Sequence, residues 1–208
     1  MFNVCPQCGA YSERKEIDPR GPFAICPTCG YAHPFVQLPL FVLTGASGAG
    51  KTTIGLHLAR SFHECVTMES DILWGAIPAT AEDNYRAYRN TWLRVAKNIG
   101  QAGRPVILVG TALPDQLEAC PERCYFTQLH YLAAVCDDAT LTERLGARPT
   151  WRGAGTASFI AEMVRFNRYL KEHAPLTSPP LALLDTSGQT IDESVAATIA
   201  WIRQWWAP

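Results

Sequence analysis

The apolar run Leu40-Phe-Val-Leu43 leads directly into the glycine-rich turn Gly45-Ala-Ser-Gly-Ala-Gly50-Lys51-Thr52, and an amphipathic stretch continues to about Phe62. This order predicts a buried strand, a tight loop and a helix. The turn fits the pattern G-x-x-x-x-G-K-[ST] in the required place between a strand and a helix. We therefore predict a phosphate-binding loop that holds ATP or GTP.

The residue types in this loop each have a chemical reason. Glycines let successive backbone N–H groups turn inward around a phosphate, and the N-terminus of the helix adds its positive dipole end. We expect the ammonium of Lys51 to reach the β- and γ-phosphate oxygens and the hydroxyl of Thr52 to bind Mg²⁺. The predicted nucleotide contacts are Gly45, Ala46, Ser47, Gly48, Ala49, Gly50, Lys51, Thr52 and Thr53.

Short apolar runs and helical patterns alternate through the rest of the chain. Strands that alternate with helices indicate an α/β fold in which a parallel sheet is covered on both faces. Further strands are expected at 65–68, 105–109, 128–136 and 181–184, and helices at about 83–101, 138–147, 156–173 and 190–206.

Residues 1–36 form a candidate module of their own, because they carry two cysteine pairs and no helical periodicity. Cys5-Pro-Gln-Cys8-Gly and Cys26-Pro-Thr-Cys29-Gly are separated by 17 residues, within the spacing of a four-cysteine zinc site. So short a module cannot be held by apolar burial alone, whereas structural zinc contributes about 10–16 kcal/mol of apparent binding free energy. The pattern resembles a zinc ribbon in which all four cysteines bind one structural Zn²⁺ and no coordination position stays open.

The balance of charge limits the partners that this chain is expected to take. Its 208 residues include 18 basic and 19 acidic side chains, so no global attraction for nucleic acid is expected. No apolar run approaches the roughly 18–20 residues that a membrane helix needs, and the first 20 residues do not resemble a signal peptide. We expect a soluble, cytoplasmic protein without a membrane partner, and the sequence predicts no particular oligomeric state.

Over about residues 39–206 the chain resembles the P-loop kinases that act on small molecules, nucleosides and nucleotides, among them shikimate, gluconate, adenylylsulfate and polynucleotide kinases. The resemblance rests on the loop 45–53, on Met68-Glu69-Ser70-Asp71, on the arginine-bearing segment 144–152 and on Asp185-Thr186-Ser187. It implies a three-layer P-loop NTPase fold with a parallel five-stranded sheet whose second strand lies at an edge. Residues 39–208 would form this kinase-like domain after the ribbon.

Two carboxylates follow the second predicted strand. Glu69 and Asp71 are two residues apart, so both point to the same side of the carboxyl edge, where open α/β sheets bind ligands. In the resembling kinases an acid here orients the acceptor hydroxyl or takes its proton, while a neighbour holds the metal's water shell. The resemblance thus implies Asp71 as the base and Glu69 as a magnesium group. Alternatively, either carboxylate caps the following helix or faces solvent.

Basic residues are concentrated between 143 and 171, where six of them accompany two acidic residues. In the resembling kinases a mobile lid in this region closes arginines over the transferring phosphoryl group. The resemblance implies a lid at about 140–156, with Arg144 and Arg148 as catalytic groups and Arg152 as a nucleotide contact. A solvated helix face is the alternative.

The third predicted strand ends at Gly110-Thr111, where many P-loop proteins carry a Walker B aspartate. Its absence disfavours a multi-subunit ATPase motor and leaves Mg²⁺ to Thr52, Glu69 and the nucleotide phosphates. Gly110 and Thr111 are expected to border the acceptor instead.

An aromatic and basic cluster lies between the second and third predicted strands. Its side chains either stack a base or sugar of the acceptor and hold an anionic group, or belong to an amphipathic helix that packs on the sheet. The sequence does not choose between these. The residues are Trp74, Tyr85, Arg86, Tyr88, Arg89 and Trp92.

Together these features predict an ATP-dependent phosphotransferase that moves the γ-phosphoryl group to a hydroxyl of a small molecule or nucleoside. A nucleoside monophosphate kinase and a polynucleotide 5′-hydroxyl kinase stay open, and the near-neutral charge disfavours the second. Another alternative is a nucleotide-gated adaptor with slow ATPase activity and the ribbon as its docking surface. The missing aspartate supports the adaptor, whereas the paired acids and the arginines oppose it.

Overall fold

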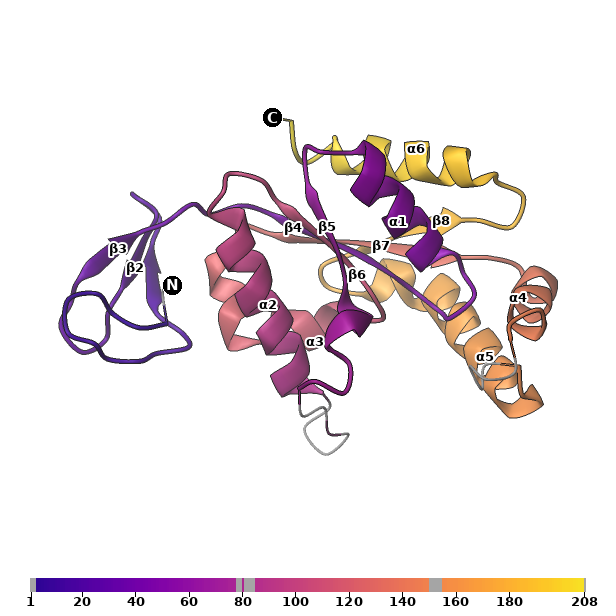
Figure 1. Ribbon diagram of the computed structural model, residues 1–208, viewed down its shortest axis with the longest axis horizontal. Coiled ribbons are helices and arrows are strands. Elements are labelled where there is room, and N and C mark those ends of the chain that lie inside the picture. The colour runs from indigo at the N-terminus through magenta and orange to yellow at the C-terminus, as the bar shows by residue number, and fades with distance from the viewer. Residues whose placement is uncertain (1–2, 78–79, 81–84, 150–154, 208) are drawn as a thin grey trace.

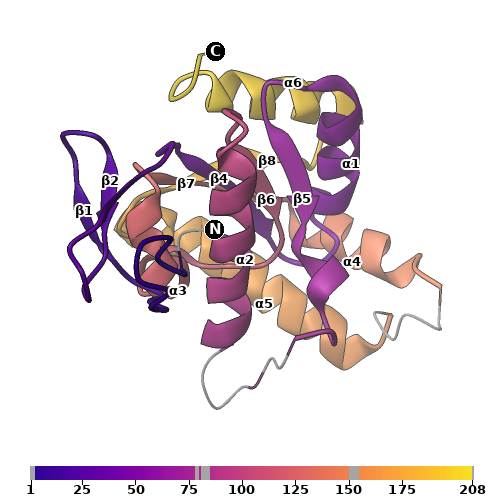
Figure 2. The same ribbon diagram turned by 60° about the vertical axis from the view of Figure 1, so that its left-hand side comes forward.

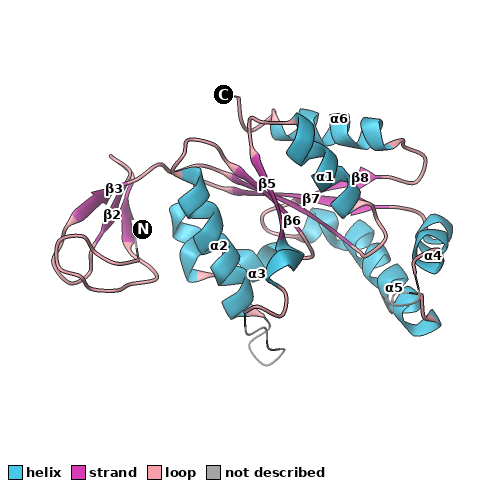
Figure 3. Ribbon diagram, in the orientation of Figure 1, coloured by secondary structure: helices cyan, strands magenta, loops and turns pink. Residues whose placement is uncertain are grey.

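The computed structural model describes residues 3–77, 80, 85–149 and 155–207, which form one five-stranded sheet flanked by helices and one small three-stranded sheet. Figure 1 shows the small sheet at one end of an elongated molecule, beside helix α2 (Arg86–Gly100). Figure 3 shows that the helices surround only the large sheet.

The large sheet is parallel and has the strand order β5-β6-β4-β7-β8. In its centre, β4 pairs Leu40 with Val106 on one side and with Leu129 on the other. The predicted edge position of the second strand, β5, is confirmed. The strands are β4 (Leu40–Gly45), β5 (Val66–Glu69), β6 (Val106–Val109), β7 (Leu129–Val135) and β8 (Leu181–Asp185).

Helices cover both faces of this sheet because successive strand residues point to opposite sides. Phe41 and Leu43 pack under α1 (Lys51–Ser61) and α6 (Ile191–Ile202). Leu40 and Val42 belong to the opposite core, which includes residues of α2, α3 (Pro114–Glu118) and α5 (Ala157–His173). Figure 2 shows α1 and α6 on one side and α2 and α5 on the other, with α4 (Asp138–Gly146) beyond the end of the sheet.

The small sheet is antiparallel and has almost no core of its own. It consists of β1 (Glu16–Asp18), β2 (Phe23–Ile25) and β3 (Ala32–Pro34). Ala24 of β2 and Phe35, which follows β3, are buried and pack on Tyr125 of the 3-10 helix η2 (Pro121–Tyr125), which belongs to the larger unit. The three-stranded sheet was not predicted, because strands of three residues carry no readable periodicity.

The strands and helices predicted from the sequence are present in the described residues, with small shifts at their ends. The last helix ends at Ile202 rather than near residue 206. The short elements α3, η1 (Ser70–Leu73), η2 and η4 (Ala174–Leu176) were not predicted. In the part of the chain that the structure describes, no helix has the length and apolarity to cross a membrane.

Gly45 offers a test of how tightly the phosphate loop is joined to the sheet. Its φ is +139°, and a Cβ there would lie 2.3 Å from the carbonyl oxygen of Ala134 in β7. Because neither backbone can move without breaking the ladder, we expect Gly45→Ala to lower the free energy of unfolding by about 3 kcal/mol in urea denaturation.

The matched control is Gly146→Ala, since a Cβ at the end of α4 would meet no atom within 4 Å. This control is expected to leave stability unchanged or to raise it by up to about 1 kcal/mol, because alanine favours helix. Equal destabilisation by the two substitutions would contradict the interpretation.

Candidate functional site

A cavity of about 520 Å³ opens at the carboxyl edge of the large sheet, where β4, β5 and β6 end. It brings together the phosphate loop, both predicted carboxylates and two of the predicted arginines. Its lining residues are Ser47, Gly48, Gly50, Lys51, Thr52, Thr53, Ile54, Glu69, Asp71, Gly110, Thr111, Arg144, Arg148, Thr186, Gln189, Thr190, Ile191 and Ser194.

The phosphate loop and the first turn of α1 line this cavity from Ser47 to Ile54, except for Ala49. Helix α1 starts after Gly50, whose φ of 100° is left-handed, and no side chain caps the helix. The first N–H groups of α1 are therefore available to an anion. Ala46 and Ala49 are fully buried, so their side chains belong to the core and only their backbone can contribute to a site.

Lys51 is buried at the bottom of the cavity, with 9% of its surface exposed. Its Nζ donates to the carbonyl oxygens of Gly45 at 2.8 Å and Ala46 at 3.0 Å. Burial lowers the pKa of Lys51 to about 8, although the charges of Asp71 and Glu69 act in the opposite direction. A desolvated ammonium held by neutral carbonyls is suited to receive a polyanion.

Thr52 and Glu69 are brought together although 17 residues separate them. The Thr52 hydroxyl donates to Glu69 Oε1 at 3.3 Å, from the first turn of α1 to the end of β5. Burial and the charge of Asp71 raise the pKa of Glu69. A hydroxyl and a carboxylate at this separation fit the oxygen ligands that Mg²⁺ prefers.

Asp71 lies in η1, two residues beyond Glu69, and lines the same cavity. Its side chain is exposed, and Oδ1 accepts a hydrogen bond of 3.4 Å from the Ser70 hydroxyl. The backbone oxygen of Ser70 accepts in turn from the Tyr88 hydroxyl of α2. Asp71 therefore faces the cavity from a segment that α2 anchors.

Gly110, which follows β6, is a glycine for a steric reason. A Cβ at Gly110 would lie 1.9 Å from Ser70 Oγ and 2.7 Å from Ser70 Cβ. An aspartate at position 110 would therefore collide with the segment that carries Asp71. Gly110 and Thr111 both line the cavity, as the sequence predicted for the acceptor side.

Two of the predicted arginines, Arg144 and Arg148, line the cavity at and after the end of α4. Arg144 of α4 donates from both terminal nitrogens to Thr186, to Oγ1 at 3.0 Å and to the carbonyl oxygen at 2.8 Å. Arg148 lines the cavity two residues beyond the end of α4, and its charge contributes to lowering the pKa of Lys51. Arg152, the remaining predicted nucleotide contact, lies outside the described residues.

One wall of the cavity was missed by the sequence analysis. It comes from the start of α6 and includes Gln189, Thr190, Ile191 and Ser194. The signal that could have found it is the pair Thr190 and Glu193, whose side chains form a reciprocal capping box. A capped helix start directly after the last strand places backbone N–H groups at the same edge.

The aromatic cluster between β5 and β6 divides into two groups. Tyr88 and Trp92 of α2 are buried in the core, at 7% and 1% exposure, as the packing interpretation predicted. Trp74 is 59% exposed, and its ring lies 5.7 Å from that of Tyr85 and 5.4 Å from that of Tyr88. Only Trp74 and Tyr85 therefore stay available as a stacking surface among these aromatics.

The four ribbon cysteines converge as predicted. Cys5 Sγ lies 3.7 Å from Cys29 Sγ, Cys8 Sγ lies 3.8 Å from Cys26 Sγ, and all four sulfurs are within 4.8 Å of one another. Four sulfurs at the usual Zn–S distance of about 2.3 Å would lie about 3.8 Å apart in a tetrahedron. Hydrogen bonds from the backbone N–H groups of residues 28 and 29 lower the pKa of Cys26 to about 6. The residues thus fit a structural zinc ion.

Comparisons with known proteins agree with this architecture. Residues 40–174 match the family model AAA_33, described as an AAA domain. Shikimate kinase from Chlorobaculum tepidum is 30% identical over an alignment of 169 residues, and the match covers 75% of this chain and 86% of that enzyme. The solved structure of a sugar kinase from Janibacter sp. HTCC2649 superposes with a TM-score of 0.57 at 16% identity, over 80% of this chain and 95% of that one. A gluconokinase from Sinorhizobium meliloti 1021 gives 0.54 at 17% identity, over 82% and 93%.

The lowered pKa of Lys51 predicts how nucleotide affinity depends on pH. Bound phosphates favour the charged ammonium and raise its pKa, so binding must take up a proton wherever the free lysine is partly neutral. We expect the association constant for Mg²⁺ with a non-hydrolysable ATP analogue to change little below about pH 7, to fall about twofold by pH 8 and to approach a tenfold fall per pH unit well above pH 8.

Calorimetry at pH 8.5 in two buffers of different ionisation enthalpy measures this proton uptake directly. The control Lys51→Met has no titrating group at this position and is expected to bind weakly with no uptake. Wild-type binding without proton uptake between pH 8 and 9 would rule out the assignment.

Proposed function

This chain belongs to the AAA_33 family and is a P-loop kinase of small molecules, and we propose that it transfers the γ-phosphoryl group of ATP to a hydroxyl group of its acceptor. The observation that carries the proposal is the arrangement of two carboxylates in one cavity. Glu69 contacts Thr52 of the phosphate loop, whereas Asp71 faces the cavity without that contact.

The phosphate loop would bind the nucleotide. Residues 45–53 would hold the phosphates through backbone N–H groups, with Lys51 on the β- and γ-phosphate oxygens. Thr52 and Glu69 would hold Mg²⁺, directly or through its water shell. The ion, when bound, supplies charge neutralisation on the transferring group.

Asp71 would act on the acceptor. Its carboxylate orients the hydroxyl for in-line attack and takes the proton as the new oxygen–phosphorus bond forms and the bond to ADP breaks. The exposure of Asp71 fits a group that must meet a diffusing substrate. Its anchoring through Ser70 and Tyr88 fits the need for fixed geometry.

Arg144 and Arg148 would stabilise charge that develops on the phosphoryl group. Arg144 is already oriented by Thr186, so little reorganisation is required of it. Arg148 follows the end of α4. The lid predicted at about 140–156 falls partly on α4 and partly on residues 150–154, which lie outside the described residues.

A small acceptor is favoured over a polynucleotide because the chain has a formal net charge of −1. We propose a nucleoside, a sugar-like metabolite or a comparable polyol as the class to be tested first. A nucleoside monophosphate acceptor would need Asp71 less, since its phosphate attacks without losing a hydroxyl proton.

Phosphate transfer from γ-labelled ATP to a panel of nucleosides, nucleoside monophosphates, sugars and 5′-hydroxyl oligonucleotides identifies the acceptor class. A labelled product is expected with wild type and is expected to disappear with Lys51→Ala, which removes the phosphate-binding ammonium. Release of inorganic phosphate alone, with a panel containing all these classes, would instead favour the nucleotide-gated adaptor.

With the acceptor found, Asp71→Asn tests the base. We expect kcat to fall by about 10²–10⁴-fold while ATP affinity stays within a few-fold, because the lost proton transfer acts only in the transition state. Asp115→Asn is the matched control, since Asp115 is exposed in α3 and does not line the cavity. Retained turnover in Asp71→Asn would sink the base assignment and favour a phosphate acceptor.

A further inference from the structure

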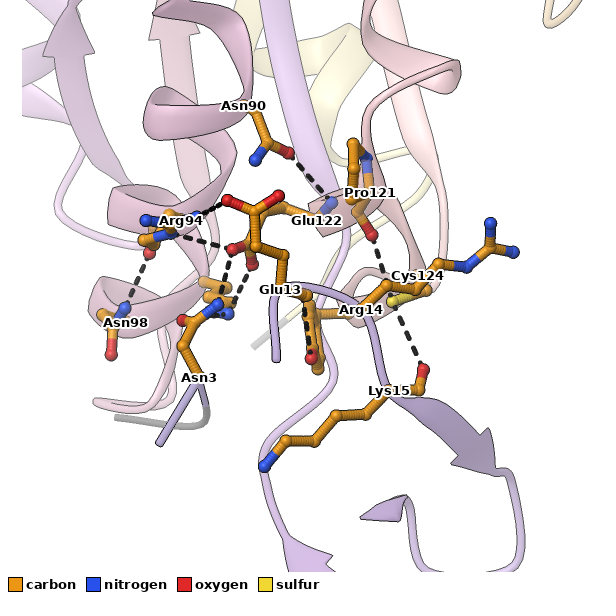
Figure 4. A network of polar contacts seen from close by, with 12 residues as sticks. Asn3, Glu13, Arg14, Lys15, Asn90, Arg94, Asn98, Pro121, Glu122 and Cys124 are labelled. Carbon is orange, nitrogen blue, oxygen red and sulfur yellow. Dashed lines mark hydrogen bonds and ion pairs between the residues drawn. The ribbon is translucent and has the colours of Figure 1, made fainter. Parts of the chain in front are cut away.

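We propose that the zinc ribbon, residues 3–36, is an internal brace for helix α2, so that metal binding in the ribbon and the order of α2 are thermodynamically linked. The inference rests on the proposed function only in taking Asp71, whose segment Tyr88 of α2 anchors through Ser70, as the group that acts on the acceptor. Its physical basis is a buried polar network that joins the ribbon to α2 and η2 (Figure 4).

The centre of this network is a buried ion pair that the ribbon completes. Glu122 of η2 is fully buried, Lys97 of α2 is 2% exposed, and the two form a salt bridge. Asn3 of the ribbon donates to Glu122 Oε1 at 2.8 Å and accepts from Lys97 Nζ at 2.9 Å. One amide therefore bonds to both members of the pair, and its loss would remove one hydrogen bond from each buried charge.

A second ion pair extends the network to the segment that follows the first cysteine knuckle, Cys5–Cys8. Arg94 of α2 donates from Nε to Glu122 at 2.8 Å and from a terminal nitrogen to Glu13 of the ribbon at 2.9 Å. Asn90 accepts from the backbone N–H of Glu122 at 3.0 Å. Asn90, Arg94 and Lys97 lie at helical spacings of four and three, so one face of α2 carries all these contacts.

Apolar and backbone contacts close the same interface. Tyr125 packs between Ala24 and Phe35 of the ribbon, and its hydroxyl donates to the backbone oxygen of Glu13 at 3.2 Å. At the end of α2, the side-chain amide of Gln101 accepts from Val36 N at 2.8 Å and donates to Val36 O at 2.9 Å. The ribbon is thus fixed to α2 at both of its own ends.

Metal binding controls this interface because the contact residues flank the first knuckle. Asn3 precedes Cys5 by two residues and Glu13 follows Cys8 by five. The backbone N–H of Ser12 donates to Asn3 O at 2.7 Å, which holds the two arms side by side. Since the ribbon's apolar core is only a few residues, we expect the four-sulfur site to be what keeps the arms in register.

The face of α2 opposite the ribbon lies next to the candidate site. Tyr88 and Trp92, on that face, line a small hollow together with Ser70, Gly110 and Thr111. Tyr88 also anchors the segment of Asp71 through its bond to Ser70. Release of the ribbon would therefore loosen the acceptor side of the cavity and leave the phosphate loop, on β4 and α1, unaffected.

Amide hydrogen exchange on the full chain, read by mass spectrometry, tests the link without knowledge of the acceptor. The zinc-loaded protein is compared with protein treated with a zinc chelator. We expect exchange to rise by about tenfold or more in peptides from 90–101 and 119–126 and to stay unchanged in peptides from 40–61. Unchanged exchange in 90–101 after zinc removal would overturn the proposal, and so would an equal rise in all peptides.

Two variants test the same link with zinc in place. Asn3→Ala removes both hydrogen bonds to the buried pair and is expected to raise exchange in 90–101 and to speed zinc release to a chelator severalfold. If that variant does not fold, Glu13→Gln removes only the exposed ion pair with Arg94 and is expected to act in the same direction. An effect on neither exchange nor zinc release would contradict the proposal.

The matched control is Arg20→Ala, which breaks an exposed ribbon ion pair with Asp18 that has no contact to α2. It is expected to behave as wild type in both measurements. Because neither measurement depends on phosphate transfer, failure of the brace can be told apart from failure of the proposed kinase reaction.

Discussion

The site depends on the central position of strand β4. All six of its residues are buried, and it is hydrogen-bonded to a parallel strand on each side. In a parallel sheet all strands run in the same direction, so their carboxyl ends meet at one edge. Each connection therefore returns from that edge to the amino end of the next strand, across a face of the sheet. The phosphate loop leaves β4 there, Glu69 ends β5 there, and Gly110 follows β6 there. The cavity is a consequence of this pairing.

Two of the lysines that the structure buries, Lys97 and Lys51, have different partners for their ammonium groups. Lys97 is matched by a buried carboxylate and an amide, which join the ribbon to the larger unit; the charge of Glu122 opposes the burial that lowers the pKa of Lys97. Lys51 is held by two neutral carbonyl oxygens, and burial lowers its pKa to about 8. The first arrangement is structural, whereas the second leaves a charge that a bound phosphate can satisfy.

The small size of the ribbon is the physical reason for its attachment to the larger unit. A module with so small an apolar core needs other sources of stability, which the four-cysteine site would supply on binding zinc and the surface on which it docks supplies here. Here the docking face lies against α2 and η2, and contacts run from Asn3 at one end to Val36 at the other. Under the proposed brace, a ribbon fixed in this way acts within the chain, whereas the adaptor alternative takes it as a partner-docking surface.

Local sequence was sufficient for the phosphate loop, the cysteine knuckles and the alternation of strands and helices, because glycine, cysteine and apolar spacings encode these features over a few residues. Glu69 and Asp71 both line the cavity as predicted, but strand alternation is not the reason, because β5 ends at Glu69 and Asp71 lies in the 3-10 helix η1. Three-dimensional folding was needed to separate buried Tyr88 and Trp92 from exposed Trp74, and to place the start of α6 in the cavity wall. It was needed most for the network around Glu122, whose partners Asn3 and Lys97 lie 119 and 25 residues away in the chain. A single glutamate forms no pattern in the sequence. Its charge becomes important to the structure only because folding buries it and so requires partners for it.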